Sequence, residues 1–102
     1  MQTITVQELK ERLEKGESIH LVDVREPYEN AEFNIGGTLL PLGDIRNMQT
    51  ESIDDWKHDE IVLYCRSGNR SGISATILDQ LGFTNTKNLV GGMLAWQEKF
   101  NR

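Results

Sequence analysis

The chain has 102 residues, enough for one domain with an apolar core that needs no disulfide or metal. Hydrophobic residues make up 37% of it and charged residues 26%, as in ordinary soluble globular proteins, and no apolar stretch reaches the length of a membrane span. The net charge of −5 argues against a nucleic-acid or membrane-surface binder, and the N-terminus lacks a basic, apolar export signal, so we expect a cytoplasmic protein.

The N-terminal part of the chain predicts a helix and then a buried strand. The stretch Thr5–Glu8 has the pattern of a capping box, and Gly16 is well placed to end the helix that this pattern opens. The β-branched stretch Ile19–Val24 follows, and its composition is typical of a strand inside a sheet. Pro27 then favours a turn or the first position of a helix.

Two more strands are predicted in the middle of the chain. The stretch Asn34–Leu42 predicts a short strand bracketed by glycine and proline turns. The polar, irregular segment Trp56–Glu60 leads into Ile61–Tyr64, which consists of four apolar or aromatic residues. That length and chemistry are typical of an internal strand of a parallel sheet.

The last third of the chain predicts a helix, a strand and a second helix. The first helix begins near Ser71, ends at Gly82 and has one apolar face made by Ile73, Ile77, Leu78 and Leu81. Thr86–Val90 predicts the last strand, and Trp96 is expected to pack in the core from the final helix. Strands that alternate with helices indicate a three-layer α/β/α fold with a mainly parallel sheet of about five strands, in one domain over residues 1–102.

The candidate chemistry lies directly after the strand Ile61–Tyr64, where the crevice of a parallel sheet opens. Cys65 ends that strand, and a short glycine-containing loop follows it. Inward N–H groups, a helix N-terminus and two arginines all favour a thiolate, so we predict a pKa for Cys65 below the ~8.5 of free cysteine. Ser71 is either a further donor to the anion or the N-cap of the helix. The candidate anion-binding loop is Arg66, Ser67, Gly68, Asn69, Arg70 and Ser71.

Cys65 is the only cysteine, which limits its chemistry. No internal disulfide is possible, and any bond that Cys65 forms must be broken by an outside thiol or nucleophile. The two histidines, His20 and His58, are distant in sequence and are expected to be exposed or otherwise satisfied, so no metal site and no cofactor are expected. The competing interpretation is that Cys65 is a small buried apolar residue at a strand end.

Three charged residues near the first strand are candidates for a structural ion pair. Asp23 and Arg25 lie at the end of that strand, and Glu32 is a further possible partner. Loop carboxylates and alternate strand residues pair often, so a structural role is favoured over a catalytic one.

Taken in order, these segments resemble the rhodanese family from about Thr5 to Phe100. The stretches that carry the resemblance are Leu21–Glu26, Cys65–Ser71, Gly82-Phe83 with Asn88-Leu89, and Gly91–Trp96. The resemblance implies a sulfurtransferase that carries sulfane sulfur as a persulfide on Cys65. It implies thiosulfate or a persulfide as donor and a thiol, cyanide or a protein thiol as acceptor. The absence of a nucleic-acid or membrane partner is expected from the net charge alone. One segment departs from the pattern, because Asn34–Gly37 stands where relatives commonly have His-Ile-Pro-Gly.

Three other functions are weighed against this one. A persulfide relay or protein-binding module would also use Cys65 but would turn over little thiosulfate, and a scaffold with an inert cysteine would use no chemistry. Cysteine phosphatases have five residues between the cysteine and the arginine of their loop, whereas four separate Cys65 from Arg70. The resemblance therefore implies a loop sized for sulfane sulfur and too small for phosphate.

Overall fold

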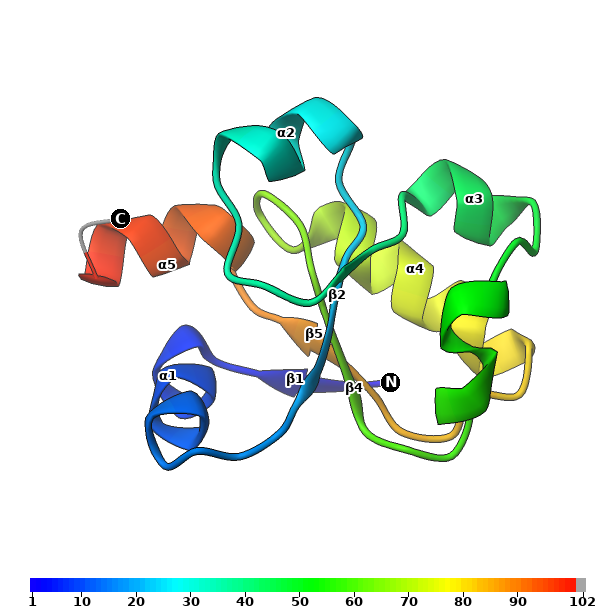
Figure 1. The fold of residues 1–102 in the computed structure, drawn as a ribbon, viewed down its shortest axis with the longest axis horizontal. Helices are drawn as coiled ribbons and strands as arrows, with labels where there is room; N and C mark the ends of the chain where they lie inside the picture. Colours follow the sequence, from blue (N-terminus) through cyan, green and yellow to red (C-terminus); the bar gives the residue numbers. More distant parts are fainter. Residues whose placement is uncertain (101–102) are drawn as a thin grey trace.

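The computed structural model describes residues 1–100 and contains a five-stranded sheet, all of whose neighbouring strands are parallel, with helices on both faces (Figure 1). The strand order is β1-β5-β4-β2-β3. The strands are β1 (Gln2–Ile4), β2 (His20–Asp23), β3 (Thr38–Leu39), β4 (Ile61–Tyr64) and β5 (Thr86–Leu89). The helices are α1 (Val6–Glu14), α2 (Pro27–Glu32), α3 (Leu42–Arg46), the 3₁₀ segment η1 (Glu51–Trp56), α4 (Asn69–Gln80) and α5 (Gly92–Phe100). The predicted α/β/α fold is confirmed.

The central strand β4 contributes to the core on both faces of the sheet. Side chains alternate along a strand, so Ile61 and Leu63 pack with residues of α3, η1 and α4, whereas Val62 and Tyr64 pack with residues of α1 and α5. Figure 1 shows the two groups of helices on opposite sides of the sheet. None of the helices in residues 1–100 combines the length and the apolar character that a bilayer crossing requires.

Several local predictions are confirmed. The Thr5 hydroxyl accepts a hydrogen bond from the Glu8 N–H at 3.1 Å, and the Glu8 carboxylate accepts one from the Thr5 N–H at 2.9 Å, which is the predicted capping box. Gly16 follows the end of α1 in a left-handed conformation. Trp96 is buried and packs edge-to-face against Phe100.

Other predictions need correction. The sequence pattern missed β1, α3 and η1, and it recognised only the first residue of α2. Helix α4 begins at Asn69, two residues before the predicted start, and its buried residues are Ser71, Ser74, Ala75 and Leu78. Ile73, predicted on the apolar face, is 37% exposed. Small side chains let α4 pack closely on the sheet, so its buried face differs from the one that the largest apolar residues suggested.

A charge cluster at the opposite end of the sheet from the Cys65 loop makes the fold sensitive to acid. Glu60 accepts hydrogen bonds from Arg12 at 2.5 and 2.8 Å and forms an ion pair with Lys87. The hydrogen bonds from Arg12 outweigh burial and hold the pKa of Glu60 at about 2, against an ordinary value of 4.5. Because the folded-state pKa is the lower one, this stabilisation is complete above the ordinary value and is lost as the pH falls toward 2.

We therefore expect Glu60→Gln to lower the free energy of unfolding at pH 7 by about 1–2 kcal/mol, because the pair is partly solvated. The variant should also lose less stability than the wild type between pH 5 and pH 2. Urea unfolding at a series of pH values measures both effects, with the exposed Glu14→Gln as a control for the charge change. Equal acid sensitivity of Glu60→Gln and the wild type would contradict this role.

Candidate active site

Cys65 lies at the carboxyl end of β4, at the start of the loop that leads into α4. Its side chain is buried, and the whole residue is 1% exposed. The Sγ atom accepts hydrogen bonds from the backbone N–H groups of Gly68 at 3.1 Å and Ser71 at 3.4 Å. Gly68 has a φ of +100°, a left-handed conformation that glycine adopts at little cost and that turns its N–H toward the sulfur.

The sulfur also occupies the place of a helix cap. Gly68 is the N-cap of α4, and it has no side chain to satisfy the first N–H groups of the helix. The Sγ of Cys65 accepts one of these N–H groups, that of Ser71, and so faces the positive end of α4. The alternative of Ser71 as N-cap is therefore wrong, since Ser71 lies inside the first turn.

These contacts lower the pKa of Cys65. Burial has the largest single effect and raises the pKa, because it disfavours the thiolate. The hydrogen bonds from the Ser71 hydroxyl and from the N–H groups of Ser71, Gly68 and Ser67 together outweigh burial. The net result is a pKa below the ordinary value of a cysteine thiol. Cys65 is therefore expected to react faster at neutral pH than a free cysteine, because a larger fraction of its thiol is ionised to the thiolate.

Two carbonyl groups at the start of the loop are bound by helix α5. The first N–H groups of α5, those of Met93 and Leu94, donate to the carbonyl oxygens of Cys65 and Arg66, each at 2.9 Å. Gly92 makes this contact possible, because a Cβ there would lie 2.3 Å from the Cys65 carbonyl oxygen. Helix α5 therefore holds the loop from one side.

Asn88 on β5 also binds the loop, and sequence reasoning missed it as a site residue. Its side-chain amide donates to the Gly68 carbonyl at 3.1 Å and accepts from the Ser71 hydroxyl at 2.5 Å. That hydroxyl also lies 3.4 Å from Sγ, and its single proton serves one acceptor at a time. The only sequence signal was the position of Asn88 in a segment that matched the family pattern.

The two arginines of the loop are in different states. Arg70 forms a two-pronged ion pair with Glu29 of α2, at 2.7 and 3.0 Å. The hydrogen bonds from Arg70 hold the pKa of Glu29 at about 2, so the pair persists at neutral pH. Arg66 is exposed, and its guanidinium has no hydrogen-bond partner within residues 1–100. Ser67 and Asn69 are also exposed.

Asp23 and Arg25 form a buried ion pair, at 2.8 Å from Arg25 Nη2 to Asp23 Oδ2. Asn30 completes it by donating to Asp23 at 2.9 Å, and the Phe33 carbonyl accepts from Arg25 at 2.7 Å. Glu32 does not join the pair, which corrects the prediction of it as a further partner. Glu32 is exposed at the end of α2, and Asn30, two residues earlier, binds the Asp23 carboxylate instead.

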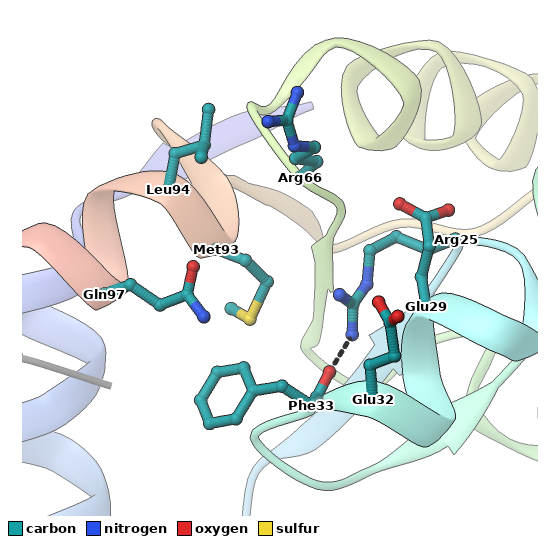
Figure 2. A pocket seen from close by; sticks show the side chains of 8 residues that line it. All are labelled: Arg25, Glu29, Glu32, Phe33, Arg66, Met93, Leu94 and Gln97. Carbon is teal, nitrogen blue, oxygen red and sulfur yellow. Dashed lines mark hydrogen bonds between the residues drawn. The ribbon is translucent and has the colours of Figure 1, made fainter.

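A pocket of about 150 Å³ opens beside the loop, between α2 and α5 (Figure 2). Figure 2 shows Arg66 at the top of this pocket and Phe33 at the bottom, with Met93 on one side and Arg25 and Glu32 on the other. The full lining is Arg25, Glu29, Glu32, Phe33, Arg66, Met93, Leu94 and Gln97. Cys65 does not line the pocket itself, although its neighbour Arg66 does. Residues 1–100 contain no cluster of side chains suited to a metal ion.

The segment that departs from the family pattern packs against the end of β4. The Tyr64 hydroxyl donates to the Gly36 carbonyl at 2.9 Å, and burial raises the pKa of Tyr64 to about 12. A Cβ on Gly37 would lie 2.2 Å from the Leu21 carbonyl oxygen, so this position requires glycine. Asn34 accepts from the Gly36 N–H at 2.8 Å and shapes the turn without a proline.

Comparisons with known proteins agree on one family. The family model described as Rhodanese-like domain matches residues 5–99, which include the whole loop. A Bacillus subtilis (strain 168) protein named "Putative sulfurtransferase YtwF" is 42% identical over 95 residues, 92% of this chain and 88% of that protein. A protein of Allochromatium vinosum named "Sulfurtransferase" is 38% identical over 94 residues, 91% of this chain and 85% of the relative. The crystal structure of a rhodanese-like domain protein from Staphylococcus aureus matches with a TM-score of 0.82 and 31% identity. The match covers 94% of this chain and 91% of that protein's chain.

Proposed function

The chain belongs to the rhodanese-like domain family, whose relatives are named for sulfur transfer, and from this membership we propose that it carries sulfane sulfur as a persulfide on Cys65. The observation that supports the proposal most is the convergence of two backbone N–H groups and a helix N-terminus on a buried Sγ. Such a site stabilises an anion on sulfur in two states, the thiolate and the outer sulfur of a persulfide. No cofactor is needed for this chemistry.

In the first step the Cys65 thiolate attacks the outer sulfur of a donor such as thiosulfate. A bond forms between Sγ and that sulfur, the sulfur–sulfur bond of the donor breaks, and sulfite leaves with the electron pair. The product is a persulfide anion held by the loop N–H groups. The near-complete burial of Cys65 favours small donors, because a single sulfur atom reaches Sγ more readily than a bulky group.

In the second step an acceptor nucleophile attacks the outer sulfur. Cyanide gives thiocyanate, and a thiolate gives a new persulfide. The bond between the two sulfur atoms breaks, and its electron pair returns to Sγ as the thiolate. A cytosolic location, which we also propose, would supply thiols as acceptors. Protein thiols are further candidates, since no second cysteine of this chain can discharge Cys65.

Intact-protein mass spectrometry tests the proposal directly. After incubation with thiosulfate, we expect a mass gain of one sulfur atom that subsequent cyanide removes. A gain only from an organic or protein persulfide would favour the relay module over the thiosulfate enzyme. No gain from any sulfur donor would contradict the proposal and favour the phosphatase or the scaffold, which hydrolysis of an aryl phosphate would separate.

Arg66 is the cation we expect to attract an anionic donor, because Arg70 is already paired with Glu29. Arg66→Gln should raise the KM for thiosulfate about 5- to 10-fold and change kcat little, since the charge assists binding in both ground and transition states. Arg46→Gln on α3 makes the same charge change at another exposed arginine and is the control. Steady-state thiocyanate formation gives both constants. An equal KM in the two variants would show that Arg66 does not bind the donor.

A further inference from the structure

Asn88 ties the sulfur-binding loop to the sheet through two partners of different kinds. Its Nδ2 atom donates to the Gly68 carbonyl oxygen, and its Oδ1 atom accepts from the Ser71 hydroxyl. The two partners fix the orientation of the amide, because a carbonyl oxygen only accepts. Gly68 and Ser71 are the same residues whose backbone N–H groups contact Cys65 Sγ, at 3.1 and 3.4 Å.

A glycine in α4 leaves the space that this side chain occupies. A Cβ on Gly72 would lie 3.3 Å from Asn88 Nδ2, which is tighter than ordinary contact. Gly72 lies inside α4, where glycine is unfavourable relative to alanine. The Asn88 amide fills the space that a Cβ at position 72 would need, which explains why glycine stands there.

We propose that Asn88 is a positioning residue for the sulfur-binding loop: it holds Gly68 and Ser71 so that their N–H groups converge on Sγ of Cys65. Within residues 1–100 no hydrogen bond joins Asn88 to the sulfur, so it acts through the loop. Its role in sulfur transfer rests on the proposed function, whereas its effect on the thiol does not. The assignment can therefore be tested without any sulfur donor.

The charged groups around Cys65 are unchanged by a substitution at Asn88. Arg66 belongs to the loop and Arg70 to the start of α4. Glu29 of α2 and Glu26, the residue before that helix, face Arg70. At the neighbouring strand end, Asp23 and Arg25 neutralise each other. Asn88 itself carries no charge. Its replacement frees the Ser71 hydroxyl to donate to Sγ, which by itself would lower the pKa of Cys65. A shift of the Cys65 titration to higher pH on replacing Asn88 by another neutral residue therefore reports displaced N–H groups.

We expect Asn88→Leu, which keeps the size and removes both hydrogen bonds, to slow alkylation of Cys65 by iodoacetamide about tenfold at pH 7. The rates of variant and wild type should converge as the pH rises, because the ionised fraction of the variant thiol then approaches that of the wild type. The limiting rate of the variant should equal or exceed that of the wild type by up to about threefold, since a more basic thiolate is intrinsically more nucleophilic. The measurement is the alkylation rate as a function of pH.

Asn85→Leu makes the same chemical change three residues earlier, at a side chain with no hydrogen bond in the part of the chain that the structure describes, and should titrate as the wild type does. An unchanged pH profile in Asn88→Leu would overturn the inference, and so would slower alkylation at every pH. If Asn88→Leu does not fold, Gly72→Ala provides a second test, because its Cβ displaces the amide by a few tenths of an ångström. Its profile should move in the same direction by a smaller amount, and an unmoved profile would again overturn the inference. If sulfur loading fails in the wild type while the alkylation profiles separate as expected, the proposed function fails and the positioning role stands.

Discussion

Replacing Cys65 by serine is expected to lower the rate of sulfur transfer by about 10⁴-fold or more, the scale seen when a catalytic nucleophile is removed. Serine fits the same buried position, but its hydroxyl stays protonated at neutral pH and gives no persulfide. The measurement is thiocyanate formation from thiosulfate and cyanide, alongside the mass of the protein. The mass gain of one sulfur atom should disappear together with the activity.

Thermal unfolding of Cys65→Ser provides the control, because a variant that melts close to the wild type has lost chemistry and not structure. In the proposed mechanism Cys65 is the only nucleophile that the protein supplies. If Cys65→Ser retained more than about one hundredth of the wild-type rate, sulfur would be passing through another group. Residual transfer of that size would therefore contradict the persulfide assignment even if the wild type gains mass.

Asp23→Leu is expected to cost about 3–5 kcal/mol of unfolding free energy, because it leaves Arg25 buried without its counter-charge. Asp23 is fully buried and accepts from the Arg25 backbone N–H, from two guanidinium nitrogens of Arg25 and from Asn30. None of these bonds reaches the sulfur. Urea unfolding at pH 7 measures the loss, and the fraction that remains folded should still accept sulfur on Cys65.

The double variant Asp23→Leu with Arg25→Leu separates the interaction from the packing. Replacing a buried ion pair by apolar residues of similar volume is often close to neutral, so the double variant should be more stable than either single variant. Additive losses would show that the two charges do not depend on each other. Loss of sulfur loading in a fully folded double variant would point to a catalytic role and contradict the structural one.

The parts of the fold that sequence could predict are those set by neighbours in the chain. The capping box of Thr5 and Glu8 involves residues three apart, and β4 is a continuous apolar run. The position of Cys65 at the strand end, before a glycine and a helix, follows from the same local order. These features need no knowledge of what lies on the other side of the sheet.

The parts that sequence could not predict depend on partners far away in the chain. Asn88 is 17 residues from Ser71, and Glu29 is 41 residues from Arg70. Nothing local marks Arg70 as paired and Arg66 as having no hydrogen-bond partner within residues 1–100, since both arginines lie in the same short stretch after Cys65. Ile73 was placed on the buried face by the helical spacing of the apolar residues, whereas close packing of α4 on the sheet favours Ser74 and Ala75 there.

The binding of the loop carbonyls by α5 and Asn88 has a consequence for how the site responds to charge. The carbonyl oxygens of Cys65, Arg66 and Gly68 accept hydrogen bonds from the Met93 N–H, the Leu94 N–H and the Asn88 side chain. A peptide group bound in this way can turn its oxygen toward Sγ only by breaking that hydrogen bond. In water, moving a negative charge by one sulfur atom would make the surrounding dipoles reorient, and that reorientation contributes to the activation barrier. In this loop the N–H groups of Gly68 and Ser71 already converge on Sγ, so a transferred sulfur would meet donors that are in place before it arrives.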